Sequence, residues 1–127
     1  MTKNITTTLA RQLYSEFLKI KKEHAAQGSY ISNAAARNII MRLPAPRFYI
    51  TPSSMYRIIS SLQEGHPLRS KGRRAEMHRE LWKRYQEQLS LLGNSALAID
   101  AVINSPAPSY YLGYHQIKKL LYYAVTV

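Results

Sequence analysis

The residues of this chain that could do chemistry are mainly its cations. Lys and Arg total 18 against seven Asp and Glu, which gives a net charge of +11. Because guanidinium and ammonium groups bind phosphate oxygens, this surplus favours polyanionic partners: nucleic acid first, then an anionic membrane face or an acidic protein. The surplus is +6 in residues 1–64 and +5 in residues 65–127, so both halves carry it. A protein that is simply basic is the alternative that charge alone leaves open.

One dense run of cations lies in the segment EGHPLRSKGRR, at residues 64–74. Arg69, Lys71, Arg73 and Arg74 fall within six residues of one another. The functional interpretation of this loop is a phosphate clamp, and the alternative is a solvated linker between two parts of the chain. The sequence leaves both interpretations open.

Other chemistry finds no support in the residue pattern. The chain has no cysteine, which excludes disulfides and thiolate metal sites. Its four histidines are scattered, the seven carboxylates form no acid–base pair, and no glycine-rich phosphate loop occurs. A tyrosine nucleophile would need an Arg and His constellation that this chain does not display. We therefore expect no enzymatic activity, no metal and no cofactor.

Tyrosines are numerous, ten in all, and five of them lie between Tyr110 and Tyr123. Tyrosines beside cations can stack on unpaired bases. The alternative is packing in the core and at its rim, which we favour for Tyr49 and Tyr111. Tyr122, near the C-terminus, is harder to bury and could instead mark a contact with a protein, as could Tyr123.

The chain contains an internal repeat at a constant offset of 62 residues. The segment AAARNIIMRLPAPRFYITPSSMYRIISSL, from Ala34, aligns without a gap on ALAIDAVINSPAPSYYLGYHQIKKLLYYA, from Ala96. The Pro-Ala-Pro of residues 44–46 falls on residues 106–108, and an aromatic pair follows in both copies. Such a match predicts a tandem duplication.

Helical periodicity divides each copy into three helices. Long amphipathic helices precede Gly28 and Gly93, which suit helix C-termini. Short Ala-rich helices follow, with Ser32 or Asn33 and Asn94 or Ser95 as expected N-caps. Extended Pro-Ala-Pro connectors, whose apolar residues should tuck back over the helices, then lead into short third helices, the first of which starts at Thr51. The prediction is an all-α fold of about six helices: a first repeat at 1–64, a basic linker at 65–74 and a second repeat at 75–127, packed as one compact domain.

The third helices present their polar faces outward. Apolar residues at i, i+3, i+4 and i+7 run from Met55 to Leu62 in one copy and from Ile117 to Ala124 in the other. Arg57 and Lys119 occupy equivalent outward positions, from which they could contact a phosphate or a base edge. The candidate nucleic-acid-binding residues are Arg47, Tyr56, Arg57, Arg69, Lys71, Arg73, Arg74, Lys118 and Lys119.

Two resemblances bear on function. In outline each sequence repeat resembles a trihelical helix-turn-helix module, in which the third helix enters the major groove. The connector from Leu43 to Pro52 is about ten residues long, however, whereas that module has a turn of three to four. The block PAPRFYIT is also similar to one in short basic proteins of bacterial mobile elements and phages, which implies the handling of DNA.

These observations favour a non-enzymatic nucleic-acid-binding protein, with DNA ahead of RNA, that acts mainly through phosphate contacts. The alternative is an assembly or accessory protein of a phage particle or larger complex, with the connectors and tyrosines as protein interfaces. A homo-oligomer or a protein partner stays open. Neither a signal peptide nor an apolar run of about 18 residues is present, so we expect no membrane association. The expected location is the cytoplasm of a bacterial or phage-infected cell, or a virion.

Overall fold

The computed structural model describes residues 2–68 and 71–126, and this part of the chain is all-α. It contains six helices and no strand, which confirms the predicted fold class. The helices are α1 (Thr2–Ala26), α2 (Asn33–Ile40), α3 (Pro52–Gln63), α4 (Gly72–Leu92), α5 (Ser95–Ile103) and α6 (Tyr114–Thr126).

Local capping sets several helix ends where the sequence predicted them. The Ser32 hydroxyl accepts a hydrogen bond from the Ala35 amide at 3.1 Å, and Asn94 caps α5 in the same way at 2.9 Å. Thr51 accepts from the Ser54 amide at 3.2 Å and is followed by Pro52 at the first position of α3. These oxygens satisfy amides that have no partner within the helix. Gly93 ends α4 at φ 66°, a left-handed backbone that glycine adopts without steric cost.

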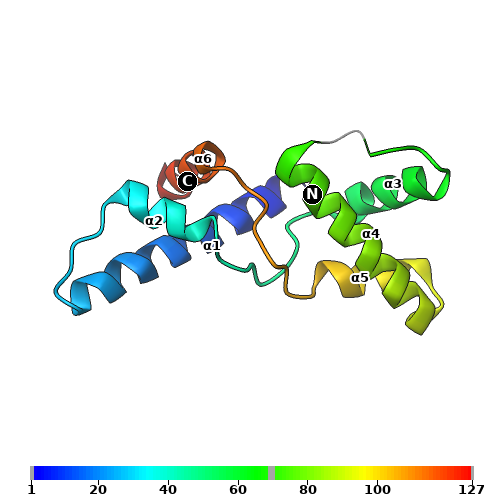
Figure 1. The fold of residues 1–127 in the computed structure, drawn as a ribbon, viewed down its shortest axis with the longest axis horizontal. Helices are drawn as coiled ribbons and strands as arrows, with labels where there is room; N and C mark the ends of the chain where they lie inside the picture. The colour runs from blue at the N-terminus through cyan, green and yellow to red at the C-terminus, as the bar shows by residue number, and fades with distance from the viewer. Residues whose placement is uncertain (1, 69–70, 127) are drawn as a thin grey trace. The chain divides into compact units, whose positions relative to one another are not determined.

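The chain divides into two compact units. We call the first the terminal unit, because it combines Met1–Leu43 with Leu112–Val127, and the second the central unit, Pro44–Tyr111. The terminal unit holds α1, α2 and α6, whereas the central unit holds α3, α4 and α5 (Figure 1). The sequence repeats and the compact units therefore do not coincide.

In the terminal unit, α6 and α2 both pack on the long helix α1 (Figure 1). Leu13 of α1, Ile40 of α2 and Ile117 of α6 are fully buried. Each helix thus contributes an apolar side chain to one core, as its periodicity predicts.

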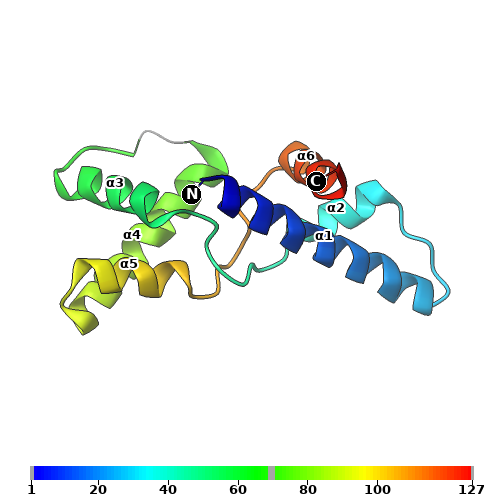
Figure 2. The ribbon, with the colours of Figure 1, turned by 180° about the vertical axis from the view of Figure 1, so that it is seen from behind.

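The central unit also combines one long helix, α4, with two shorter ones, but here the main partner of the long helix is α5. Helix α5 packs along α4, and α3 contacts both (Figure 2). Its core contains Leu81 of α4, Met55 and Ile59 of α3, and Val102 of α5. Met55 and Ile59 were expected to be buried in this way.

The two Pro-Ala-Pro connectors pair with each other inside the central unit. Ala45 and Ala107 form an antiparallel bridge in which each amide donates to the other's carbonyl at 2.9 Å. The ring of Phe48 stacks near that of Tyr111 at 6.2 Å, and Tyr49 stacks near Tyr110 at 6.0 Å. The connectors therefore tuck their apolar residues inward, and Tyr49 and Tyr111 serve in packing, as expected.

Each third helix packs with the long helix of the other sequence half. Helix α3, from residues 1–64, joins α4 and α5, while α6, from residues 75–127, joins α1 and α2. The extended connectors lead each third helix to the other long helix, and the bridge between Ala45 and Ala107 joins the two connectors. Helices α2 and α5, like α3 and α6, still begin 62 residues apart. The duplication itself stays a prediction.

Candidate nucleic-acid interface

Helix α3 presents Tyr56 and Arg57 to solvent, as its apolar spacing predicted. The Arg57 guanidinium donates to the Ser54 hydroxyl at 3.3 Å, one turn earlier on the same helix. Ser54 in turn accepts from the Thr51 hydroxyl at 2.9 Å. The side chain that caps α3 thus also helps to position Arg57.

The cations of residues 71–74 form the start of α4. Lys71 is the N-cap residue but makes no side-chain capping hydrogen bond, and Arg73 and Arg74 lie exposed in the first turn. This turn contains no acidic residue, although the positive end of a helix dipole favours one. The local field is therefore strongly positive. Arg69, the other cation predicted in this run, lies outside the described residues.

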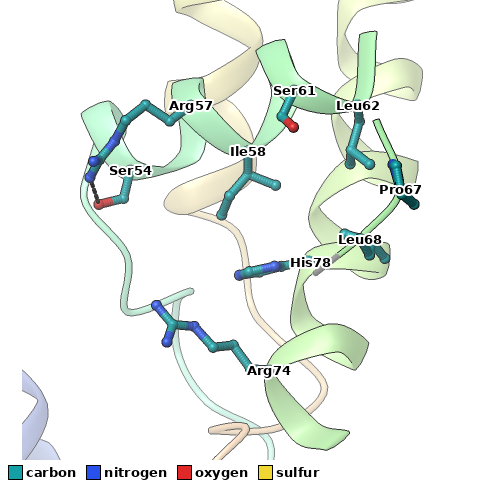
Figure 3. Close-up of a pocket in the computed structure, with 9 residues that line it drawn as sticks. All are labelled: Ser54, Arg57, Ile58, Ser61, Leu62, Pro67, Leu68, Arg74 and His78. Carbon is teal, nitrogen blue, oxygen red and sulfur yellow. Dashed lines mark hydrogen bonds between the residues drawn. The ribbon is translucent and has the colours of Figure 1, made fainter. Parts of the chain in front are cut away.

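A surface pocket of about 320 Å³ between α3 and α4 is lined by both Arg57 and Arg74, and the Arg57 side chain turns toward Ser54 (Figure 3). Arg74 and His78 project from α4 toward α3, on which Arg57 and Ser54 are hydrogen-bonded. No Asp or Glu lines this pocket in the described part of the chain. Its lining residues are Ser54, Arg57, Ile58, Ser61, Leu62, Pro67, Leu68, Arg74 and His78. We call it the arginine pocket.

His78 lies at the wall of the arginine pocket and is only 7% exposed. Burial lowers the pKa of His78 below the ordinary value of 6.5, and the positive charge of Arg74 lowers it further. The imidazole is therefore neutral at neutral pH. Sequence reasoning treated His78 as one of four scattered histidines. The spacing of four residues from Arg74 on a helix was the signal that could have found it.

Four of the other predicted residues in the described central unit do not line this pocket: Arg47, Tyr56, Lys71 and Arg73. Arg47 donates to the Phe48 carbonyl at 3.1 Å and stacks over the Tyr49 ring at 5.4 Å, so the connector holds it. Tyr56 is exposed on α3 but does not line the pocket.

Lys118 and Lys119 belong to the terminal unit, where both are exposed on α6 and line a second pocket of about 470 Å³. Its walls are mainly apolar and aromatic, and its lining comes from α1, α2 and α6. We call it the tyrosine pocket. Its lining residues are Tyr14, Phe17, Asn33, Arg37, Lys118, Lys119, Leu121, Tyr122 and Val125.

Arg37 is a cation of this second pocket that sequence reasoning missed. Its guanidinium donates to the Tyr114 hydroxyl at 3.1 Å and lies 5.8 Å from the centre of that ring. Its buried Nε atom has no hydrogen-bond partner. Arg37 sits one residue after the buried Ala36 and three before the buried Ile40, so helical spacing already placed it at the edge of the core.

The pocket cations lack acidic partners. Within the described residues the ion pairs are Arg84–Glu80 at 2.6 Å and His66–Glu64 at 3.4 Å. Arg57, Arg74 and Arg37 take part in neither. Their charge is therefore available to an anion from outside the chain.

Comparison with protein families, with curated proteins and with solved structures gives no match for this chain. Across residues 2–68 and 71–126, no helix is both long enough and apolar enough to cross a bilayer. In the same residues, no three His, Asp or Glu side chains come together as metal ligands would.

Proposed function

We propose that this protein is a non-enzymatic nucleic-acid-binding protein that acts mainly through phosphate contacts, with DNA as the favoured ligand. The observation that carries the proposal is that Arg57 of α3 and Arg74 of α4 line one pocket that has no acidic side chain among its described lining residues. The resemblance of PAPRFYIT to a block in proteins of mobile elements and phages supports DNA and a bacterial or phage-infected cell.

The arginine pocket suits a phosphate group for three reasons. Two guanidinium groups offer charge-assisted hydrogen bonds, which are shorter and stronger than neutral ones. The hydroxyls of Ser54 and Ser61 add polar groups to the same wall. The start of α4 contributes the positive end of a helix dipole. Arginine is also the cation best suited to recognise phosphate oxygens in a bidentate way.

The test is the salt dependence of binding to a duplex oligonucleotide. Each phosphate contact contributes a slope of about −0.9 to the log–log plot of affinity against salt. The double variant Arg57→Ala/Arg74→Ala should therefore reduce the slope by about two units and weaken binding to all sequences alike. Fluorescence anisotropy over a series of salt concentrations measures both effects.

The matched control is Arg79→Ala/Lys83→Ala, which removes two exposed cations from α4 outside the arginine pocket. Its net charge equals that of the first variant. If both double variants weaken binding equally, bulk charge explains the effect and the pocket has no special role. Wild-type protein that fails to bind any oligonucleotide at low salt would reject the proposal.

An assembly or accessory protein is the second candidate, and three exposed leucines near the turn between α4 and α5 favour it. Leu91 and Leu92 end α4, Leu97 lies in the first turn of α5, and their exposed fractions are 78%, 45% and 56%. Large exposed apolar side chains are a feature of protein-binding surfaces. Sedimentation of Leu91→Ser/Leu97→Ser against wild type tests this candidate, because loss of a stable oligomer would place these leucines in an interface.

A further inference from the structure

We propose that the tyrosine pocket holds an unpaired base, so that the terminal unit binds single-stranded nucleic acid; this inference rests on the proposed function and specifies its ligand. The pocket combines an aromatic wall with a basic rim, and these two properties suit the two parts of a nucleotide. It belongs wholly to α1, α2 and α6 and involves none of the residues of the arginine pocket.

The wall of the pocket is suited to a flat apolar ring. Tyr14 and Phe17 come from α1, and Tyr122 from α6 is 73% exposed. An exposed tyrosine at the mouth of an apolar pocket offers a free aromatic face. Bases stack on such faces with little dependence on sequence, because every base has a π-face.

The rim of the pocket selects an anion. Lys118 and Lys119 project from α6 and Arg37 from α2, and no acidic residue lines the pocket in the described chain. Arg37 is already held by its contacts with Tyr114. An electrically neutral apolar ligand or a basic peptide would leave three cations beside it without compensation. A nucleotide within a strand compensates them with its flanking phosphates.

Among nucleic-acid ligands, an unpaired base fits these requirements better than a base within a duplex. In a duplex each base face is covered by its neighbours, so a protein must take a base out of the stack before its own rings can cover it. A strand without partners exposes these faces. The terminal unit has nine Lys and Arg residues and two Glu residues, which gives a net charge of +7. The central unit has nine Lys and Arg residues and five Asp and Glu residues, which gives a net charge of +4. This charge provides the attraction for the strand's backbone.

The experiment compares three fluorescently labelled ligands of equal length: a single strand, the duplex, and an abasic single strand that keeps the phosphates but lacks the bases. Wild type should bind the single strand more tightly than the abasic strand. Tyr122→Leu, which keeps an apolar side chain but removes the ring, should weaken single-strand binding by roughly 5- to 150-fold. It should leave binding of the abasic strand unchanged. With a single strand that carries 2-aminopurine, binding of wild type should quench the 2-aminopurine fluorescence, and Tyr122→Leu should abolish this quenching.

Tyr30→Leu is the control, because Tyr30 is an 81% exposed tyrosine of the same unit outside the pocket. It should leave affinity and quenching unchanged. Equal binding of the normal and abasic strands, or equal effects of the two variants, would overturn this inference and leave the proposed function intact. Absence of binding to all three ligands would overturn both. A change of oligomeric state in Tyr122→Leu without a change in strand binding would assign the pocket to a second copy of the chain and also overturn the inference.

Discussion

Helix α3 packs against α4, and α6 packs against α1. Each helix also lines a pocket, but α3 and α6 line their pockets with opposite sides of the helix. In the central unit, Ser61 of α3 lines the arginine pocket. The residue 62 positions later is Tyr123 of α6, whose hydroxyl lies 3.2 Å from that of Thr7 on α1. A large side chain thus bridges α6 to α1 where a small one leaves a pocket between α3 and α4.

On the opposite side of these helices, the terminal unit has the pocket and the central unit has the side-chain contact. Val125 of α6 and Asn33 of α2 line the tyrosine pocket. The residues at the same offset in the central unit are Gln63 and Ser95, which are joined through Tyr85. Gln63 donates to the Tyr85 hydroxyl at 3.5 Å, and that hydroxyl donates to Ser95 at 3.1 Å. The central-unit residues at the offset positions thus form a hydrogen-bonded chain, whereas Val125 and Asn33 line a pocket.

The comparison teaches that two units, each built from one long and two shorter helices, can offer two kinds of site. The choice depends on single side chains at the third helix: Ser61 or Tyr123 on one side, Gln63 or Val125 on the other. Changing these residues should move the open site while the helices stay in place.

The largest expected effect concerns the separate cores of the two units. Leu13 of α1 and Leu81 of α4 are both fully buried, so Leu13→Ala and Leu81→Ala should each lower the free energy of unfolding by about 2–5 kcal/mol. Urea unfolding followed by circular dichroism measures this. Trp82, the one tryptophan of the chain, lies in the central unit and reports on that unit alone by fluorescence. If the units unfold independently, Leu13→Ala will leave the Trp82 transition unchanged; a shared shift shows that they unfold together.

Exchanging the residues at the offset should alter the arginine pocket directly. Ser61→Tyr should fill it and remove its contribution to the salt slope of duplex binding, at little cost to the free energy of unfolding because the pocket is open. Tyr123→Ser should lower that free energy by about 1–3 kcal/mol, since a half-buried ring and a hydrogen bond to Thr7 are lost. Anisotropy and urea unfolding of both variants give the comparison. An undiminished salt slope in Ser61→Tyr would show that phosphate does not enter this pocket.

His78 has no counterpart of its kind in the terminal unit's core and should make stability depend on pH. Its pKa is lowered in the folded protein, so the unfolded chain binds the proton more readily as pH falls below about 6.5. The free energy of unfolding should therefore be constant with respect to this group above that pH and decrease below it. His78→Gln should show a smaller decrease between pH 7.5 and pH 5. An equal decrease in wild type and variant would assign the pH dependence to other groups.

An anion in the arginine pocket should act on the same group in the opposite direction. A phosphate beside the imidazole stabilises its protonated form, which raises the pKa of His78 toward or above its ordinary value. Titration of the His78 ring by NMR, with and without a duplex oligonucleotide, would detect the shift. A pKa of His78 that does not respond to bound duplex would contradict phosphate occupancy.

The helices were predictable because their signals are local. Apolar spacing fixed the buried faces of α3 and α6, and Ser32, Thr51 and Asn94 marked helix starts through hydrogen bonds that reach only three residues. The exchange of α3 and α6 between the two halves was not predictable in this way. It depends on the pairing of Ala45 with Ala107, a contact between distant segments that no periodicity records.

For the candidate site residues too, exposure was predictable from local sequence, whereas their grouping into pockets was not. Exposure of Arg57 and Lys119 followed from the apolar positions around them, and both are exposed. Arg57 and Arg74 line one pocket because α3 packs on α4. Arg37 and Lys118 line another pocket because α6 packs on α2. Both are tertiary contacts, so the sequence named most of the cations without grouping them into pockets.

The smallest expected effect on stability concerns Arg57 and Lys119, the cations at equivalent positions of α3 and α6. Both are exposed, so Arg57→Ala and Lys119→Ala should each change the free energy of unfolding by about 0.5 kcal/mol or less.

Their effects on binding should differ, because Arg57 lines the arginine pocket and Lys119 the tyrosine pocket. Arg57→Ala should mainly weaken duplex binding, and Lys119→Ala should mainly weaken single-strand binding, with each salt slope falling by about one unit. Measuring both variants against both ligands forms a four-way comparison in which bulk charge predicts four similar losses. Four similar losses would therefore reject a division of labour between the units. Loss of discrimination between duplex sequences in Arg57→Ala, instead of uniform weakening, would show that α3 reads base edges rather than phosphates.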